Sequence, residues 1–225
     1  MSINEMSNFA HQKAVIFLNG EIRNKKYYNK LIQDKSIDLL IAADGGAKIF
    51  LELGTYPDFV IGDLDSLGKQ EVEKLKTEES EMISYPQDKD ETDAELCLQF
   101  CHDHSIKKAI LTCSLGGRID QQLANIFLLE YGINLGMDCK IVEPNLEIGL
   151  IESKKIFSNK IGWFLSLLPL NYEIEEVSIK GCKYEVSNLN MKRFLTRGIS
   201  NKISASEAEI SVGEGKLIYI LRKGE

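Results

Sequence analysis

Short apolar runs alternate with stretches of helical spacing along the first 142 residues. The apolar runs predict strands at 14–18, 38–44, 58–62, 81–85, 108–113 and 138–142. The helical spacing predicts helices at 24–33, 46–53, 68–77, 92–104 and 118–131. Continuous apolar runs that alternate with helices are typical of a parallel sheet covered on both faces. In such sheets ligands bind beyond the carboxyl ends of the strands.

The pattern changes near residue 150. Shorter apolar runs, several of them alternating with polar residues, follow at 162–170, 175–181, 182–186 and 215–222. No long helix is predicted there, and this pattern is typical of a small antiparallel sandwich or barrel. We therefore predict two domains, an α/β domain with a Rossmann-like parallel sheet over 1–148 and a β-rich domain over 149–225. The segment 143–155 is the predicted junction.

Composition indicates a globular protein of the cytoplasm. Of the 225 residues 44% are hydrophobic, enough for a sizeable core. No apolar run reaches the roughly 18 residues of a membrane helix, and the start of the chain lacks the pattern of a signal peptide. The number of cysteines, five, is odd, and they form no CxxC pair. They are therefore interpreted as buried thiols in a reducing compartment.

The charge is distributed unevenly along the chain. Residues 1–150 hold 15 Lys/Arg against 25 Asp/Glu, whereas residues 151–225 hold 12 against 9. The net charge of −7 argues against nucleic acid as a partner. An acidic first half is an ordinary solvated surface unless particular carboxylates cluster.

Four polar motifs follow predicted strands of the first half. They are "ADGGA" (43–47), "GDLDS" (62–66), "KDETD" (89–93) and "LGGRIDQ" (115–121). "KDETD" opens the helix after the fourth predicted strand, and each of the others directly follows its strand. Because the strands of a parallel sheet end at the same edge, all four motifs are expected there.

"GDLDS" places two carboxylates close together. Residues two apart in an extended chain point the same way, about 6–7 Å apart. Asp63 and Asp65 would repel each other unless a cation lies between them, and their hard oxygen ligands suit Mg²⁺. The alternative is a turn in which Asp65 or Ser66 caps the next helix.

"KDETD" also has two interpretations. Thr92 followed by Glu95 fits a capping box at the start of a helix. Asp93 would then occupy the first helical position, where the helix dipole favours its charged form. By itself the motif favours helix capping. Beside Asp63 and Asp65, Asp93 becomes a candidate third ligand of the cation.

Two glycine pairs lie at strand-to-helix turns. Gly45–Gly46 and Gly116–Gly117 permit positive φ and a close approach of backbone to a ligand. Free amides at such turns attract phosphate, and Arg118 adds a cation suited to bidentate phosphate contact. Neither pair belongs to a GxxxxGK[ST] or a GxGxxG motif, so each alone is a weak signal.

In this order the four motifs resemble those of the thiamine pyrophosphokinase family. "GCKYEVSN" (181–188) and "RGISN" (197–201) are similar to the family's weaker C-terminal motifs. The resemblance implies an N-terminal α/β domain, a C-terminal β domain and a homodimer whose sites lie between subunits. It also implies Mg²⁺-dependent transfer of pyrophosphate from ATP to the hydroxyethyl group of thiamine, which leaves AMP.

The resemblance also implies roles for individual residues. Asp63, Asp65 and Asp93 match the acidic cluster that holds Mg²⁺ and the phosphates. The residues that match the ATP site are Asp44, Gly45, Gly46, Arg118, Asp120 and Gln121. Many relatives have His where Gln121 stands.

For thiamine the resemblance implies Ser200 of "RGISN". Tyr219 is the candidate for an aromatic ring that stacks on thiamine, and an ordinary strand aromatic is the alternative. Asp93 could orient the thiamine hydroxyl or accept its proton, and an acidic site would favour the approach of the cationic thiazolium ring.

Two other functions stay open. A different ATP-dependent kinase or pyrophosphokinase on the same architecture would share the metal and nucleotide motifs. A non-catalytic regulatory module that binds thiamine or a nucleotide is the other alternative, but binding alone does not require the carboxylate cluster.

Overall fold

The computed structural model describes residues 13–224, which divide between Pro144 and Asn145 into two compact units. The start of the chain, on which the prediction about a signal peptide rests, lies outside the described residues. The predicted division at 148/149 lies four residues beyond the structural one. The α/β and antiparallel β architectures predicted for the two halves are both confirmed.

The N-terminal unit is built on a parallel sheet. Its described strands lie in the order β6-β5-β1-β2-β3-β4, and every pairing among them is parallel. The strands are β1 (Lys13–Phe17), β2 (Leu39–Ala43), β3 (Phe59–Gly62), β4 (Glu81–Ser84), β5 (Lys108–Thr112) and β6 (Asp138–Glu143). The strand order reverses between β1 and β5, which makes this position the switch point where such sheets bind ligands.

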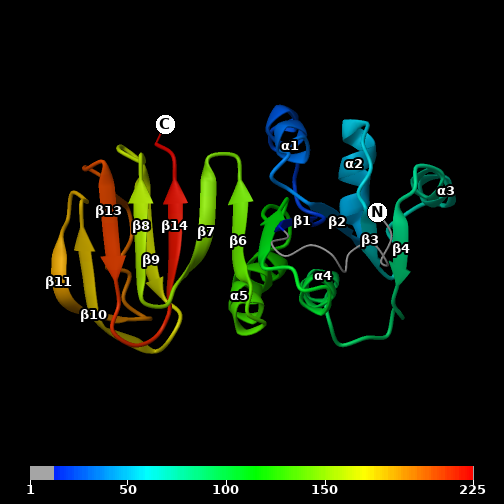
Figure 1. Ribbon diagram of the computed structural model, residues 1–225. Helices are drawn as coiled ribbons and strands as arrows, with labels where there is room; N and C mark the ends of the chain where they lie inside the picture. The colour runs from blue at the N-terminus through cyan, green and yellow to red at the C-terminus, as the bar shows by residue number, and fades with distance from the viewer. Residues whose placement is uncertain (1–12, 225) are drawn as a thin grey trace. The chain divides into compact units, whose positions relative to one another are not determined.

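Helices cover both faces of this sheet (Figure 1). They are α1 (Lys25–Ile32), η2 (Asp44–Gly46), α2 (Ala47–Leu53), α3 (Lys69–Thr77), α4 (Asp93–Asp103) and α5 (Ile119–Asn134). Tyr28 of α1, Phe50 of α2 and Leu75 of α3 join one apolar cluster with β1, which places these helices on the same face. Helices α4 and α5 lie on the other face (Figure 1).

Burial on both faces explains the continuous apolar runs of the sequence. Val15, Ile16 and Phe17 of β1 point alternately to opposite faces, and all three are fully buried. Side chains mark where two of the helices begin. Asn24 Oδ1 accepts a hydrogen bond from the Tyr27 amide at α1, and Thr92 Oγ1 accepts one from the Glu95 amide at α4. The predicted capping role of Thr92 is therefore confirmed.

The C-terminal unit is antiparallel throughout its described strands. Two sets of strands, β12-β9-β14-β7 and β11-β10-β13-β8, share one apolar core, to which Leu165 and Leu217 of the first set and Val177 and Ile210 of the second contribute. The strands are β7 (Leu146–Ile151), β8 (Lys154–Ser158), β9 (Phe164–Pro169), β10 (Glu173–Lys180), β11 (Val186–Lys192), β12 (Asn201–Lys202), β13 (Glu207–Ser211) and β14 (Leu217–Arg222).

The structure differs in several places from the prediction for the second half. The division between the units lies inside the predicted junction 143–155, but this segment also contains the whole of β7, which pairs with β14, and strands β8, β12 and β13 were not predicted either. Gly149 weakens the strand pattern of β7, but the position must be glycine because a Cβ there would lie 2.6 Å from the hydroxyl of Tyr219. The run 182–186 is mostly a turn and bridge rather than a strand, because Gly181 turns the chain at φ +74° before β11 begins at Val186.

The five cysteines (Cys97, Cys101, Cys113, Cys139 and Cys182) are free thiols and all are buried, as predicted. Among residues 13–224 there is no helix long and apolar enough to cross a membrane.

Candidate functional site

A cavity of about 360 Å³ opens at the carboxyl ends of the parallel strands. Asn19 and Gly20 reach it from the end of β1, and Ser114 reaches it from the end of β5, on the two sides of the switch point. Asp44 follows β2 and Asp63 follows β3, and both side chains line the same cavity. The predicted convergence of the strand-end motifs at one edge is therefore observed.

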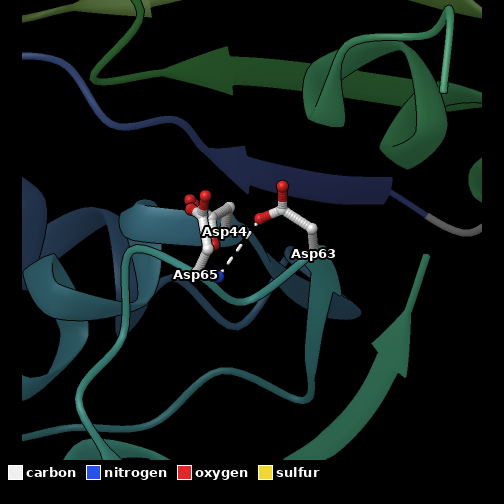
Figure 2. A group of neighbouring side chains, drawn as sticks. All are labelled: Asp44, Asp63 and Asp65. Carbon is white, nitrogen blue, oxygen red and sulfur yellow. Dashed lines mark hydrogen bonds between the residues drawn. The ribbon is translucent and has the colours of Figure 1, made fainter. Parts of the chain in front are cut away.

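Three aspartates converge beside this cavity (Figure 2). Asp44, Asp63 and Asp65 each offer a carboxylate oxygen, and these oxygens lie within 4.8 Å of one another. Asp63 Oδ1 accepts a hydrogen bond of 3.1 Å from the Asp65 amide, and Gln87 Nε2 donates one of 2.7 Å to Asp65 Oδ2. These contacts fix two of the carboxylates but leave the negative charge of the group unbalanced.

Asp44 is the most buried member of the three. It is 7% exposed, and its Oδ1 has no hydrogen-bond partner among the described residues. An unpartnered carboxylate oxygen in the interior costs free energy. Its backbone, at φ +41°, is in the left-handed region, a further cost that tends to occur at functional sites. Both costs suit a carboxylate whose missing partner is a ligand.

The glycines of "ADGGA" serve close packing rather than positive φ. Neither Gly45 nor Gly46 has a positive φ. A Cβ on Gly46 would lie 2.1 Å from the Phe17 carbonyl oxygen, and one on Gly45 would lie 2.5 Å from the side-chain Nδ2 of Asn19. The pair lets the turn that carries Asp44 sit directly against the end of β1.

The donor set of the three aspartates fits a hard divalent cation. Carboxylate oxygens on short, restrained segments are ligands that Mg²⁺ and Ca²⁺ prefer, and Mg²⁺ commonly uses one or two of them with phosphate oxygens. The group is therefore a possible metal site. It includes the predicted ligands Asp63 and Asp65, and it adds Asp44, for which the family resemblance implies a place in the nucleotide site.

Asp93 stands next to this group but has its own partner. Its Oδ1 lies 2.6 Å from the ammonium nitrogen of Lys89. Burial raises the pKa of the Asp93 carboxyl, the contact with Lys89 lowers it, and the charges of Asp44 and Asp63 raise it. Asp93 is thus close enough to feel the other carboxylates, but it lies outside the group of three. Its role as a metal ligand stays a prediction.

Lys89 is a site residue to which the sequence analysis gave no role. Its side chain is only 12% exposed and lines the cavity, where it is the single cation among the described lining residues. Its position in "KDETD", four residues before Asp93, was the signal that could have revealed it, because this spacing allows an ion pair across the start of the helix.

The "LGGRIDQ" motif divides between the cavity and the surface. Gln121 lines the cavity, and so does Gly116, whose φ is +96°. Arg118 and Asp120 are exposed and pair with each other at 2.5 Å, outside the cavity lining. This contact lowers the pKa of Asp120. Their predicted contact with a nucleotide requires that the pair separate or turn.

The two residues predicted for thiamine lie in the C-terminal unit. Ser200 is exposed at φ +62°, and its amide donates a 3.0 Å hydrogen bond to Ser166 Oγ. Tyr219 is only 1% exposed, its hydroxyl donates to Glu147 Oε1 at 2.7 Å, and its ring packs against Phe157. A ring buried in this way matches the alternative interpretation, an ordinary strand aromatic, and offers no open face for stacking.

Comparison with known proteins matches both halves of the chain to one family. Residues 28–141 match the model of the thiamin pyrophosphokinase catalytic domain, and residues 154–217 match that of its vitamin B1 binding domain. A thiamine pyrophosphokinase of Bacillus subtilis (strain 168) is 27% identical over 184 residues, which are 81% of this chain and 86% of the relative.

Solved structures have the same fold. A crystal structure of thiamine pyrophosphokinase from Bacillus subtilis superposes with a TM-score of 0.83 at 23% identity, covering 95% of this chain and all of the other. A yeast thiamin pyrophosphokinase gives a TM-score of 0.77 at 17% identity, covering 99% of this chain and 90% of the other.

Proposed function

The chain belongs to the thiamin pyrophosphokinase family, and we propose that its cavity transfers a diphosphate group from ATP to the hydroxyl of thiamine. The products are thiamine diphosphate and AMP. The observation that carries this proposal is the group of three aspartates at the switch point, with the unpartnered buried oxygen of Asp44. A carboxylate cluster beside a nucleotide-sized cavity is the arrangement that transfer between phosphates requires.

The reaction exchanges one phosphorus–oxygen bond for another. The hydroxyl oxygen of thiamine bonds to the β-phosphorus of ATP. The bond from that phosphorus to the oxygen shared with the α-phosphate breaks, and AMP leaves with this oxygen and its electron pair. The proton of the hydroxyl must pass to a base. The site therefore has to hold two substrates in line, balance phosphate charge and accept one proton.

The proposed metal ligands are Asp44, Asp63 and Asp65, with Asp93 next to them. A bound Mg²⁺ would neutralise charge on the phosphate oxygens. Asp63 and Asp65 are already oriented by hydrogen bonds, so little rearrangement of this segment is needed for binding. In this proposal the third direct metal ligand is Asp44 rather than Asp93. Asp93 is then available for a second role in the reaction.

That role is to orient the thiamine hydroxyl and accept its proton. Burial raises the pKa of Asp93, which makes its carboxylate a better proton acceptor than an exposed one. The neighbouring Lys89 ammonium lowers the pKa of Asp93 and so favours its ionised form, and Lys89 is also the cation best placed to contact a phosphate. Lys89 could exchange its carboxylate partner for a phosphate oxygen during the reaction.

The remaining contacts are proposed for each unit by itself. The turn with Gly116 and Gly117, followed by Gln121, would hold the nucleotide, with Arg118 recruited from its pair with Asp120. The segment around Ser200 would contact thiamine, as the family resemblance implies. Tyr219 is not included in this site, because its ring is buried.

We also propose a homodimer. The surface of α5 carries Ile119, Leu123 and Phe127, which are 69%, 49% and 57% exposed. Residues four apart on a helix lie on one face, so these side chains form an apolar stripe that a second copy of the chain could cover.

The function is tested with the purified chain, ATP, Mg²⁺ and thiamine, followed by chromatographic separation of the products. Thiamine diphosphate and AMP in equal amounts support the proposal. ADP with thiamine monophosphate would mean transfer of one phosphate only and would refute it. Turnover of ATP with another hydroxyl compound but not with thiamine would favour the second candidate, a different ATP-dependent kinase on this fold.

A further inference from the structure

A buried carboxylate behind the cavity has no part in the function described so far. Glu143 ends strand β6, is 5% exposed and does not line the cavity. Its Oε2 accepts a 2.8 Å hydrogen bond from the hydroxyl of Tyr28 on α1. Its Oε1 accepts two from Ser114, one of 2.8 Å from the amide and one of 3.2 Å from the hydroxyl.

Ser114 links this carboxylate to the cavity wall. It is 3% exposed and lines the cavity at the end of β5. Its carbonyl oxygen accepts a 2.9 Å hydrogen bond from Asn125 Nδ2, and Asn125 of α5 lines the same cavity. A continuous series of hydrogen bonds therefore connects Tyr28, Glu143, Ser114 and Asn125.

The turn held in this way has an unusual backbone. Cys113, Gly116 and Gly117 have φ values of +49°, +96° and +71°. A left-handed φ in a non-glycine residue such as Cys113 costs free energy and persists only where neighbouring contacts enforce it. On one side the Gly20 amide donates to the Cys113 carbonyl at 2.7 Å. On the other side Ser114 is held by Glu143.

Burial of a carboxylate costs free energy, so Glu143 would be an unfavourable residue at this position if its only role were to fill space in the core. Burial raises the pKa of the Glu143 carboxyl, although the hydrogen bonds from Ser114 and Tyr28 lower it again. Apolar side chains of similar volume are often equally stable in such places. What an apolar side chain cannot supply is an acceptor for the Ser114 amide, which is the group that fixes the first residues of the turn.

We propose that Glu143 is a positioning residue for the nucleotide, which acts by fixing Ser114 and the turn 113–117 at the switch point. This inference rests on the proposed function, because it assumes that the turn contacts ATP. Glu143 itself touches no substrate. Its two oxygens have separate tasks, since one faces Ser114 and the cavity while the other faces Tyr28 and the core.

The separate tasks define matched variants. Glu143→Leu removes both acceptors and keeps a side chain of similar size. Glu143→Gln keeps an oxygen for Ser114 and turns its amide toward the Tyr28 hydroxyl, which can accept. Tyr28→Phe leaves the bonds to Ser114 intact but removes the bond to Oε2 and the contact of the Tyr28 hydroxyl with the Cys113 thiol, so it is the comparison variant for the core side of the network. If Glu143→Leu does not fold, Glu143→Asp, one methylene shorter, takes its place.

The readouts are the KM values for ATP and thiamine, the kcat, the melting temperature, and calorimetric binding of a nonreactive ATP analogue with Mg²⁺. We expect Glu143→Leu to raise the KM for ATP and the dissociation constant of the analogue about tenfold or more, as expected when a buried donor loses its partner. The KM for thiamine should change much less. Glu143→Gln should bind the analogue almost as the wild type does. Tyr28→Phe should lower the melting temperature but weaken binding of the analogue much less than Glu143→Leu does, because the Ser114 amide keeps its acceptor.

Two results would overturn the inference. One is a folded Glu143→Leu variant, or Glu143→Asp in its place, with unchanged analogue binding. The other is an equal effect of Tyr28→Phe and Glu143→Leu on nucleotide binding, which would make Glu143 a general stabilising residue. Failure of the proposed function is distinguishable from both, because it would appear in the wild-type protein as absence of thiamine diphosphate and AMP.

Discussion

The ammonium of Lys89 lies 2.6 Å from the carboxylate of Asp93, four residues further along the chain. This pair balances the charge of one aspartate at the cavity and leaves Asp44, Asp63 and Asp65 as the unbalanced group. The pair therefore distinguishes Asp93 from the other three aspartates of the site. Three carboxylates are available to a cation, whereas the fourth is already paired with an ammonium.

Lys89→Met should change the pH dependence of the reaction. Loss of the ammonium removes an influence that lowers the pKa of Asp93, so this pKa rises further. If Asp93 accepts the proton, the acidic limb of the kcat/KM profile moves to higher pH. Lys89→Arg, which keeps the charge, is the control and should leave the limb near its wild-type position. An unchanged limb in Lys89→Met would contradict a proton-accepting role for Asp93.

Removal of a charge from the group of three should weaken cation binding. Asp63→Asn is expected to lose most activity and Asp44→Asn to raise the Mg²⁺ concentration for half-maximal activity about tenfold or more, since each variant removes a hard oxygen ligand. Calorimetric titration with Mg²⁺ and the nonreactive ATP analogue measures the binding directly.

The control is Asp103→Asn, an exposed aspartate at the last position of α4. It should bind Mg²⁺ and turn over as the wild type does. Equal Mg²⁺ dependence of Asp44→Asn and the wild type would remove Asp44 from the metal site.

Gly62→Ala should inactivate the protein by crowding the site. A Cβ at this position would lie 2.9 Å from the Cβ of Asp44 and 3.1 Å from Oδ1 of Asp93. Both carboxylates would have to move, and we expect a loss in kcat/KM of about a hundredfold, as small displacements of positioned groups cause. Steady-state kinetics measures the loss.

Gly54→Ala separates crowding from backbone strain. Gly54 ends α2 at φ +70°, and no atom lies within 4 Å of a Cβ built there. This variant should lose about 1 kcal/mol of stability from the left-handed backbone but keep its activity. An active Gly62→Ala variant would show that Asp44 and Asp93 do not need their observed positions.

Protonation of Glu143 should affect stability. Burial raises its pKa in the folded protein, so the folded state binds this proton more tightly than the unfolded state does. This contribution to stability is present below the ordinary pKa of a glutamate and is lost as pH rises through the folded pKa. Glu143→Gln removes it, so its melting temperature should fall less between acidic and neutral pH than that of the wild type. If the melting temperatures of Glu143→Gln and the wild type changed equally with pH, the raised pKa of Glu143 would be contradicted.

Ser200 and Tyr219 should behave differently towards thiamine. Ser200→Ala is expected to raise the KM for thiamine, since the segment around Ser200 is the proposed thiamine contact. Tyr219→Phe loses the hydrogen bond to Glu147 and should cost about 1 kcal/mol of stability with little change in that KM. Thermal denaturation and steady-state kinetics measure both effects. A larger thiamine effect in Tyr219→Phe would reverse the assignment.

Most elements of the parallel-sheet half could be predicted, but fewer of the C-terminal strands could. The apolar runs and helical spacing located β1 to β6 and α1 to α5, because buried strands and amphipathic helices have distinct local periods. In the second half β7, β8, β12 and β13 were missed, and β7 shows one reason. Gly149 in β7 interrupts the apolar pattern of a strand. Glycine is needed there because the Tyr219 ring lies against that position, and Tyr219 is 70 residues away in the chain.

The sequence by itself determined the chemistry available to this protein: which residues are acidic, which follow a strand, and which family pattern they form. Tertiary structure alone decided which of those residues come into contact. Asp44 meets Asp63 and Asp65 because β2 and β3 are neighbours in the sheet. Glu143 reaches Ser114 because β6 pairs with β5. Strand order is set by packing between distant segments, so no local pattern contains it.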